Sequence, residues 1–230
     1  MNKSLIYRIS AAVSGISGIV ILFGVIAPIV SYEQQSSWKY PQLVSPLPQG
    51  SSLNEEIEKL DYTKASNWFT GGAAKENFTS SNISYYTVTI PRLKIENATV
   101  AIGGEDLAKS LIQYPGTALP GRPGNSVIFG HSVLPIFFNP KDYISIFSTL
   151  DTLKKGDEIG VNYDGVSYLY RVESSFEVLP SDIQVLQQDP SDSFLTLVTC
   201  VPPGDPRKPR RLIVRARIIP LKEANANSRD

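Results

Sequence analysis

The chain has 230 residues, and its 22 basic and 22 acidic side chains cancel to a formal net charge of +0 at pH 7. This balance argues against a polyanionic partner, so we expect no nucleic acid. The single cysteine excludes an intramolecular disulfide, and the single histidine argues against a zinc site, which needs four ligands. We therefore expect no metal and no cofactor. The length allows a membrane segment, a linker and one domain with a packed core.

An uncharged apolar run from Ile9 to Val30 predicts a membrane-spanning helix. At about 1.5 Å per residue the run spans about 33 Å, close to the ~30 Å hydrocarbon core. More basic residues precede the run than follow it, so the positive-inside rule favours a cytoplasmic N-terminus and an exported remainder. The alternative is a cleaved signal peptide, but the run exceeds the usual ~7–15 apolar residues and no clean small-x-small cleavage site follows. We expect residues 1–31 to form a short cytoplasmic stub and a single-pass anchor in the cell membrane.

Residues 32–83 are polar and interrupted by Pro, Gly and Ser, which is typical of an extracytoplasmic linker that holds a domain off the bilayer. A short helix is predicted within it over residues 52–60. Trp68 and Phe69 form a bulky pair in this polar stretch. The favoured interpretation places the pair on the outside of the domain, and the sharper alternative makes this stretch a cover over the active-site groove. Residues 222–230 form a polar tail.

Residues 84–221 have the composition of a β domain. The dipeptide Asp164-Gly165 predicts a tight hairpin turn, and residues 180–193 predict a long loop. Short helices are expected over residues 105–111 and 143–150. The expected strands cover residues 85–90, 93–102, 126–130, 158–163, 166–178, 195–200 and 212–219. Seven to eight short strands with little helix favour a mainly β fold, a closed or nearly closed barrel rather than a sandwich.

Three chemically distinctive residues fall at the ends of predicted strands. Cys200 ends the apolar run that begins at Thr196, and the two prolines that follow must stop that strand. The lone histidine, His131, follows the apolar run of residues 125–130, and Arg211 opens the last one. Together they form a candidate thiol-nucleophile site.

These residue types suit acyl transfer. A cysteine attacks as its thiolate, which a neighbouring cation stabilises, and an arginine stays charged and can hold an oxyanion. A histidine can protonate the leaving amine and then deprotonate the incoming nucleophile. Each residue alone has a structural explanation: a buried small thiol, a packed imidazole, or an arginine in a solvated basic loop. Arg210 is the rival of Arg211 for the cationic role.

The motifs Gly130-His131-Ser132, Thr196-Leu197-Val198-Thr199-Cys200 and Arg211-Leu212-Ile213-Val214 closely resemble those of the sortases, the bacterial cell-surface cysteine transpeptidases. The resemblance covers about residues 84–220. It implies an eight-stranded sortase barrel with Cys200 as nucleophile, His131 as acid and base, and Arg211 as the residue that holds the oxyanion or positions the substrate.

The resemblance also implies the substrates. Sortases, which act as thiol peptidases and acyltransferases, cleave an LPxTG-like C-terminal sorting signal of a surface protein between Thr and Gly and pass the acyl group to an amine of a cell-wall precursor or pilin. The 180–193 loop falls where the family recognises its substrate. We expect Val185, Leu186, Phe194, Thr196 and Thr199 to contact the substrate. No Asp-Pro-Trp motif supports pilin polymerisation, and the subclass stays open.

Two other functions are open. An L,D-transpeptidase is a different cysteine acyltransferase, but that family usually has histidine and glycine just before the cysteine, whereas Val198 and Thr199 stand there in this chain. A non-enzymatic, membrane-tethered β domain would leave the strand-end positions of the three residues to coincidence.

Overall fold

The computed structural model of the chain describes residues 3–40, 61–73, 75–78 and 84–220. A long helix, α1 (Lys3–Lys39), leads into a β domain made of β1 (Ser84–Ile90), β2 (Ile95–Ile102), β3 (Leu111–Gln113), β4 (Gly124–Phe129), β5 (Glu158–Tyr163), β6 (Val166–Val178), β7 (Ser193–Val201) and β8 (Arg210–Ile218). Short 3-10 turns connect them: η1 (Ala65–Asn67), η2 (Lys75–Asn77), η3 (Pro91–Leu93), η4 (Pro135–Phe137), η5 (Leu150–Thr152) and η6 (Ile183–Leu186).

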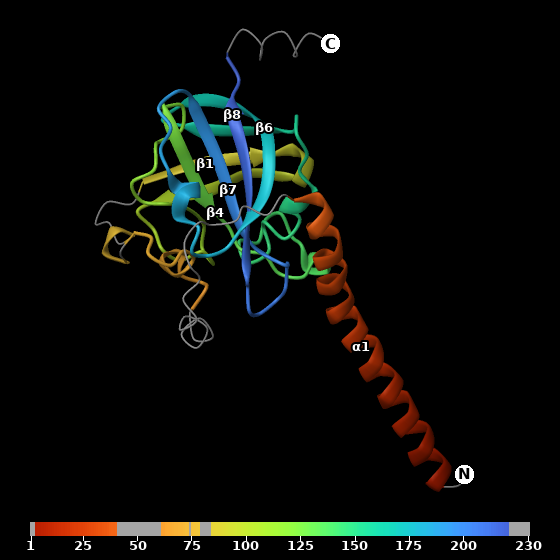
Figure 1. Cartoon of the computed structure of the whole chain (residues 1–230). Helices are drawn as coiled ribbons and strands as arrows, with labels where there is room; N and C mark the ends of the chain where they lie inside the picture. Colours follow the sequence, from red (N-terminus) through yellow and green to blue (C-terminus); the bar gives the residue numbers. More distant parts are fainter. Residues whose placement is uncertain (1–2, 41–60, 74, 79–83, 221–230) are drawn as a thin grey trace, which may run out of the picture.

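The strands close into a barrel in the order β1-β2-β3-β4-β7-β8-β6-β5 (Figure 1), which confirms the predicted fold class. The β2–β3 and β4–β7 pairs are parallel and the others antiparallel. The predicted hairpin is also confirmed: Tyr163 pairs with Val166, and both turn residues, Asp164 and Gly165, have positive φ angles of 52° and 73°. Such angles suit Asp-Gly because glycine has no Cβ to clash.

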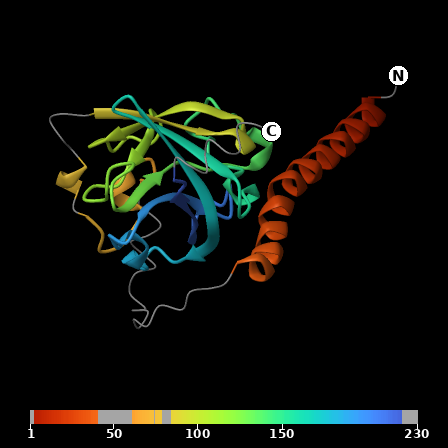
Figure 2. The same cartoon turned by 90° about the horizontal axis from the view of Figure 1, so that it is seen from above.

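Successive side chains of a strand point to opposite faces of the barrel wall, and this produces two apolar clusters. The inner cluster fills the barrel with side chains such as Val88, Leu197 and Val214. The outer cluster lies on the other face of β3, β4, β7 and β8, where residues such as Phe129 and Val198 pack against the segment of residues 61–78. That segment lies on one side of the barrel and α1 on another (Figure 2).

The two helices predicted within the domain are wrong. In residues 105–111, the backbone of Glu105 and Leu107 bonds to Ala65 and Thr63 of the 61–78 segment, which leaves it unavailable for helical hydrogen bonds. Residues 143–149 form turns that lead into η5, because Phe147 N donates to His131 O (2.9 Å) rather than to a helical carbonyl. The hydrogen bond from Phe147 therefore holds the start of the loop that follows His131.

The N-terminal helix is longer than its apolar run. Residues 32–39, predicted to begin a linker, continue α1 as far as Lys39. Tyr7–Lys39 is long and apolar enough to cross a membrane. The predicted helix at 52–60 and the polar tail at 222–230 lie outside the described residues.

Candidate active site

The three predicted site residues lie in one row across neighbouring strands. Cys200 of β7 is the direct partner of Arg211 of β8 in their antiparallel ladder. On the other side of β7, the parallel β4 pairs Phe129 with Val198, and Gly130 N continues the ladder by donating to Val198 O (3.1 Å). The next residue, His131, therefore lies beside Cys200 at the same end of the barrel.

The thiol belongs to the outer face of the barrel. On β7, Leu195, Leu197 and Val201 point into the inner cluster, whereas Val198 and Cys200 belong to the outer one. Cys200 is nevertheless only 1% exposed. The sulfur therefore lies outside the barrel, and another segment of the chain covers it.

The cover is the 61–78 segment, and Trp68 is its centre. The Trp68 indole, fully buried, stacks on Phe129 (ring centroids 5.1 Å apart) and lies 5.9 Å from the His131 ring. Trp68 Nε1 donates to Tyr62 O (2.9 Å), and Phe69 also packs on Phe129. Trp68 and Phe69 do lie outside the barrel, but they sit over the site. The favoured interpretation, a pair packed on the outside of the domain, therefore holds, and the contact of Trp68 with His131 also agrees with the alternative of a cover.

Arg211 is fully buried against this cover. Its Nε donates to Trp68 O (3.0 Å) and its Nη1 to Lys208 O (2.8 Å). The guanidinium carbon lies 5.7 Å from the Trp68 ring and 5.4 Å from the Tyr62 ring, within cation–π range. Its Nη2 is buried without a hydrogen-bond partner among the described residues. An unused, desolvated donor of this kind suits a developing oxyanion.

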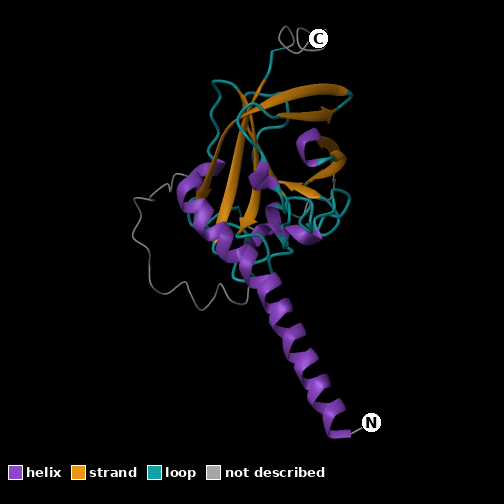
Figure 3. Cartoon of the chain, turned by 90° about the vertical axis from the view of Figure 1, so that its right-hand side faces the viewer, coloured by secondary structure: helices purple, strands orange, loops and turns teal. Residues whose placement is uncertain are grey.

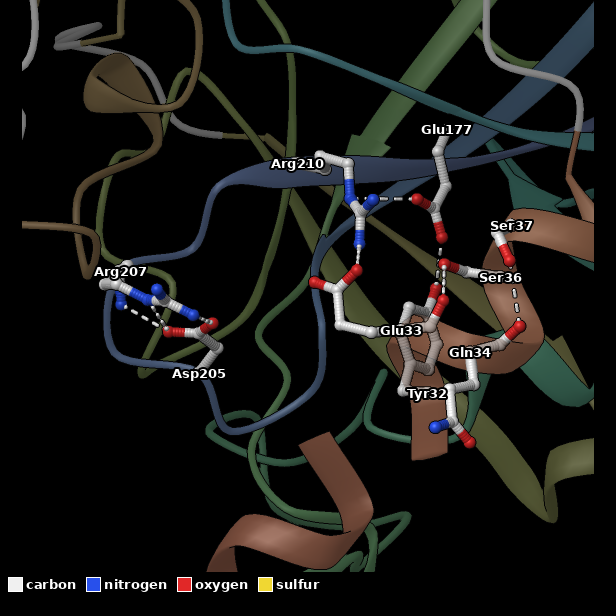
Figure 4. A network of polar contacts seen from close by, with 9 residues as sticks. All are labelled: Tyr32, Glu33, Gln34, Ser36, Ser37, Glu177, Asp205, Arg207 and Arg210. Carbon is white, nitrogen blue, oxygen red and sulfur yellow. Dashed lines mark hydrogen bonds and ion pairs between the residues drawn. The ribbon is translucent and has the colours of Figure 1, made fainter. Parts of the chain in front are cut away.

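The alternation of β8 places the two arginines in different surroundings. Arg211 shares the outer face with Cys200, whereas Arg210 pairs with Glu177 (3.0 Å) and with Glu33 of α1 (2.6 Å), as Figure 4 shows. Arg210 therefore belongs to the contact between α1 and the barrel.

His131 is held neutral in this closed arrangement. Burial, and to a lesser degree the positive charge of Lys208, lowers the pKa of His131 from 6.5 to about 4, although Asp106 and Asp61 act in the opposite direction. A neutral imidazole can accept the proton of the thiol. The closed form thus keeps the imidazole uncharged at neutral pH.

Ser132 is a site residue that the sequence pattern did not single out beyond its place in the Gly-His-Ser motif. Its Oγ donates to Cys200 O (2.6 Å), which ties the loop after β4 to the end of β7. This hydrogen bond fixes the distance between the two backbones that carry the histidine and the cysteine.

The residues predicted to contact the substrate do not lie together in the structure. Val185 and Leu186 pack at the edge of the outer cluster that contains Cys200. Thr196 shares that face but its Oγ1 donates to Asn125 Oδ1 (2.7 Å), and Thr199, paired with the inward-facing Leu212, donates to Gly130 O (2.8 Å). Phe194 lies at the far end of β7 beneath Arg215 and Arg217.

Fold and site together define a class: a closed β-barrel that brings a cysteine, a histidine and an arginine together on its outer face. Residues 88–219 match the family model described as Sortase domain. The chain belongs to the sortase family, whose members are cysteine transpeptidases.

Three relatives illustrate the relationship. Sortase A of Streptococcus agalactiae serotype III (strain NEM316) is 27% identical over 117 residues, which cover 51% of this chain and 45% of that protein. The matched part thus spans less than half of that relative. The solved Sortase A of Corynebacterium diphtheriae is 25% identical (TM-score 0.54; 87% of this chain and 86% of that one). The lid mutant of Streptococcus agalactiae Sortase C1 is also 25% identical (TM-score 0.51; 60% and 70%).

Proposed function

We propose that this protein is a membrane-anchored transpeptidase that attaches surface proteins to an amine through a thioester at Cys200. The observation that carries the proposal is the row formed by His131, Cys200 and Arg211 at the ends of three adjacent strands. Three residues far apart in the sequence meet at one rim, and each has the chemistry that one role in acyl transfer requires.

The proposed reaction has two halves. In the first, His131 takes the proton of the Cys200 thiol while the sulfur attacks a peptide carbonyl, and the free Nη2 of Arg211 donates to the oxygen as it becomes negative. The C–N bond breaks, and His131 returns the proton to the leaving amine. In the second half an acceptor amine loses its proton to His131 and attacks the thioester, which releases Cys200 with its proton restored.

The substrate is proposed to be a C-terminal sorting signal of the LPxTG type, and the acceptor an amine of a cell-wall precursor or a protein. Val185 and Leu186 support this assignment because they extend the apolar surface that begins at the thiol. The hydrogen bonds of Thr196 and Thr199 to β4 and the loop after it suit a structural role for both residues better than substrate contact.

We further propose that the 61–78 segment is a lid that must move before a substrate can enter. Trp68 occupies the space between His131 and Arg211, where a substrate carbonyl would have to lie. A relative of this chain has been solved as a lid mutant, so a lid belongs to the structural repertoire of that protein.

The proposed location is the cell membrane, with α1 as a single span, a cytoplasmic N-terminus and an extracytoplasmic barrel. The apolar helix Tyr7–Lys39 supports the anchor, and the basic residues before its apolar run support the orientation.

The test is mass spectrometry of the full chain, in detergent, incubated with a small library of LPxTG-like peptides and an amine. We expect a thioester adduct on Cys200 and a product in which the amine replaces the peptide's C-terminal part. Cys200→Ala is the control. If no peptide of the library is cleaved, the result would favour the non-enzymatic tethered domain. If only peptides of the peptidoglycan type are cleaved, it would favour an L,D-transpeptidase.

A further inference from the structure

A tight apolar turn projects from the domain close to the site. In η4, Ile136 is 81% exposed and Phe137 is 66% exposed, and the two are consecutive. The turn is rigidly held, because Phe137 N donates to Leu134 O (2.9 Å) and Phe138 N to Pro135 O (3.1 Å). Two large apolar side chains fixed in water are unfavourable, so a surface of this kind indicates a partner.

The turn lies at the same end of the barrel as the site. It follows His131 in the loop after β4, and β4 is parallel to β7, so this loop and the β7–β8 loop of residues 202–209 leave the barrel together. The two loops also pack closely together. Gly204 lies so near to Leu134 that a Cβ atom built on Gly204 would be 2.6 Å from Leu134 Cδ2. The β7–β8 loop carries Arg207, whose side chain is 75% exposed, and Lys208.

The docking of α1 fixes how high this end of the barrel stands above a membrane. The partly or fully buried residues of the helix recur on one face, at 27–29, 32–33, 36 and 40. Tyr32 Oη donates to Glu177 (2.8 Å), Glu33 pairs with Arg210 at the start of β8, and Lys39 Nζ bonds to Asp151 O. Figure 4 shows the contacts of Tyr32 and Glu33, which together with Lys39 hold the C-terminal part of the helix to the barrel.

The contact with β8 comes directly after the membrane-spanning run. The apolar run ends at Val30, and Glu33 follows about 5 Å further along the axis at about 1.5 Å per residue. In Figure 1 the loops that follow β4 and β7 gather at the end of the barrel from which the N-terminal half of α1 extends, while β8 ends at the opposite side. Figure 3 shows loops gathered at the end of the barrel from which α1 extends. With the apolar run of α1 placed in the bilayer, the rim that holds Cys200 would stand near the level where the hydrocarbon ends.

We propose that the turn Pro135–Phe137 inserts into the outer interface of the bilayer and, with α1, holds the active-site rim at the membrane surface. Apolar side chains enter the boundary between headgroups and acyl chains. Lys208 and Arg207, which pairs with Asp205 (2.7 Å), lie in the adjoining β7–β8 loop and would face the region where anionic headgroups gather. The inference rests on the proposed anchor and deepens the proposed function: the site faces substrates and acceptors that are themselves held at the membrane surface.

The test uses the full chain with Cys200→Ala, reconstituted in phosphatidylcholine–phosphatidylglycerol vesicles. An environment-sensitive fluorophore is attached at Ile136→Cys or, as the matched control, at Val166→Cys. Val166 is 48% exposed beside the β5–β6 turn, at the opposite end of the barrel. We expect lipids with brominated acyl chains to quench the probe at 136 and to leave the probe at 166 unaffected.

Each other result overturns the proposal. Equal quenching by aqueous iodide at both positions would mean that the turn stays in water. A blue-shifted probe at 136 without quenching by the lipid would mean that protein covers it, for example a second copy of the chain. Flotation of the vesicles shows separately whether α1 anchors the chain.

A second measurement connects insertion to activity. In the chain with Cys200 intact, the double change Ile136→Gln and Phe137→Gln should lower the turnover of a sorting peptide carried on a lipid anchor and leave the turnover of the same peptide in solution unchanged. Equal turnover of the anchored peptide by both proteins would contradict insertion. Absence of turnover in the parent would count against the proposed enzyme, while the fluorescence result would still decide the position of the turn.

Discussion

Trp68 and Arg211 are joined by a hydrogen bond and a ring contact: Arg211 Nε donates to Trp68 O at 3.0 Å, and the guanidinium carbon lies 5.7 Å from the indole ring. The covering segment therefore binds the very cation that the proposed chemistry requires. The proposed site is therefore closed in this state, which leads to the first prediction.

Replacing Trp68 by Ala should open the site. The change removes the stacking on Phe129 and the wall beside His131, so we expect faster alkylation of Cys200 by iodoacetamide, by roughly tenfold or more if the cover contributes at least about 1.4 kcal/mol to closure. Loss of a buried Trp also costs about 3–5 kcal/mol of stability, so thermal melting must show that the variant is folded.

The matched control is Trp38→Ala, because Trp38 is 93% exposed on α1 and touches no part of the site. This variant should alkylate at the parent rate. If folded Trp68→Ala is alkylated no faster than Trp38→Ala, the 61–78 segment is not what protects the thiol.

The buried imidazole should make the fold sensitive to acid. The folded pKa of His131 is lowered to about 4 from 6.5, so as the pH falls below 6.5 the unfolded chain gains a proton that the folded chain does not take up. Stability is therefore fully present above pH 6.5 and is lost progressively down to about pH 4. At pH 5 the expected loss is about 2 kcal/mol.

Urea unfolding at pH 7 and at pH 5 measures this loss, and His131→Gln removes the contribution of the histidine while other titrating groups stay the same. The parent should lose about 2 kcal/mol more than the variant between the two pH values. An identical pH dependence for both proteins would show that the imidazole titrates as it does in water.

The geometry of the guanidinium, and not only its charge, should matter at Arg211. Lysine keeps the positive charge but has no planar fork to bind Trp68 O and Lys208 O while leaving Nη2 free. We expect Arg211→Lys to lower kcat by about 10²–10³-fold, as removal of an oxyanion donor does. Arg210→Lys is the neighbouring control and should retain most of kcat in a soluble-peptide assay. Equal losses in the two variants would contradict the assignment of Arg211.

The contact between α1 and the barrel should depend on its buried carboxylate. Glu177 is almost fully buried between Arg210 and Tyr32, and its burial raises its pKa. Removing one partner of a buried ion pair leaves the other charge unpaired, so Glu177→Ala should cost about 3–5 kcal/mol. Glu33→Ala removes a partner that is 43% exposed and should cost below about 1 kcal/mol. Chemical unfolding of the full chain in detergent distinguishes the two, and equal costs would mean that Glu177 is not specifically needed.

Much of the fold could be predicted because its signals are local. The alternation of β7, the prolines that end it, and the Asp-Gly turn between β5 and β6 each depend on neighbours in the sequence. The same is true of the positions of His131, Cys200 and Arg211 at strand ends. The helix predicted at residues 143–150 did not form, because Phe147 N donates to His131 O, a contact with a distant part of the chain that the local sequence does not record.

The sequence alone thus determined the chemistry available to this protein, a lone thiol, a lone imidazole and an arginine at the ends of strands, because residue type and alternation are properties of short stretches. Only the tertiary structure decided that Trp68 packs against His131 and Arg211, that Arg210 is drawn into the contact with α1, and that α1 is held to the barrel around the buried Glu177. These are contacts between segments far apart in the chain, and their energies depend on burial and register that no local pattern records.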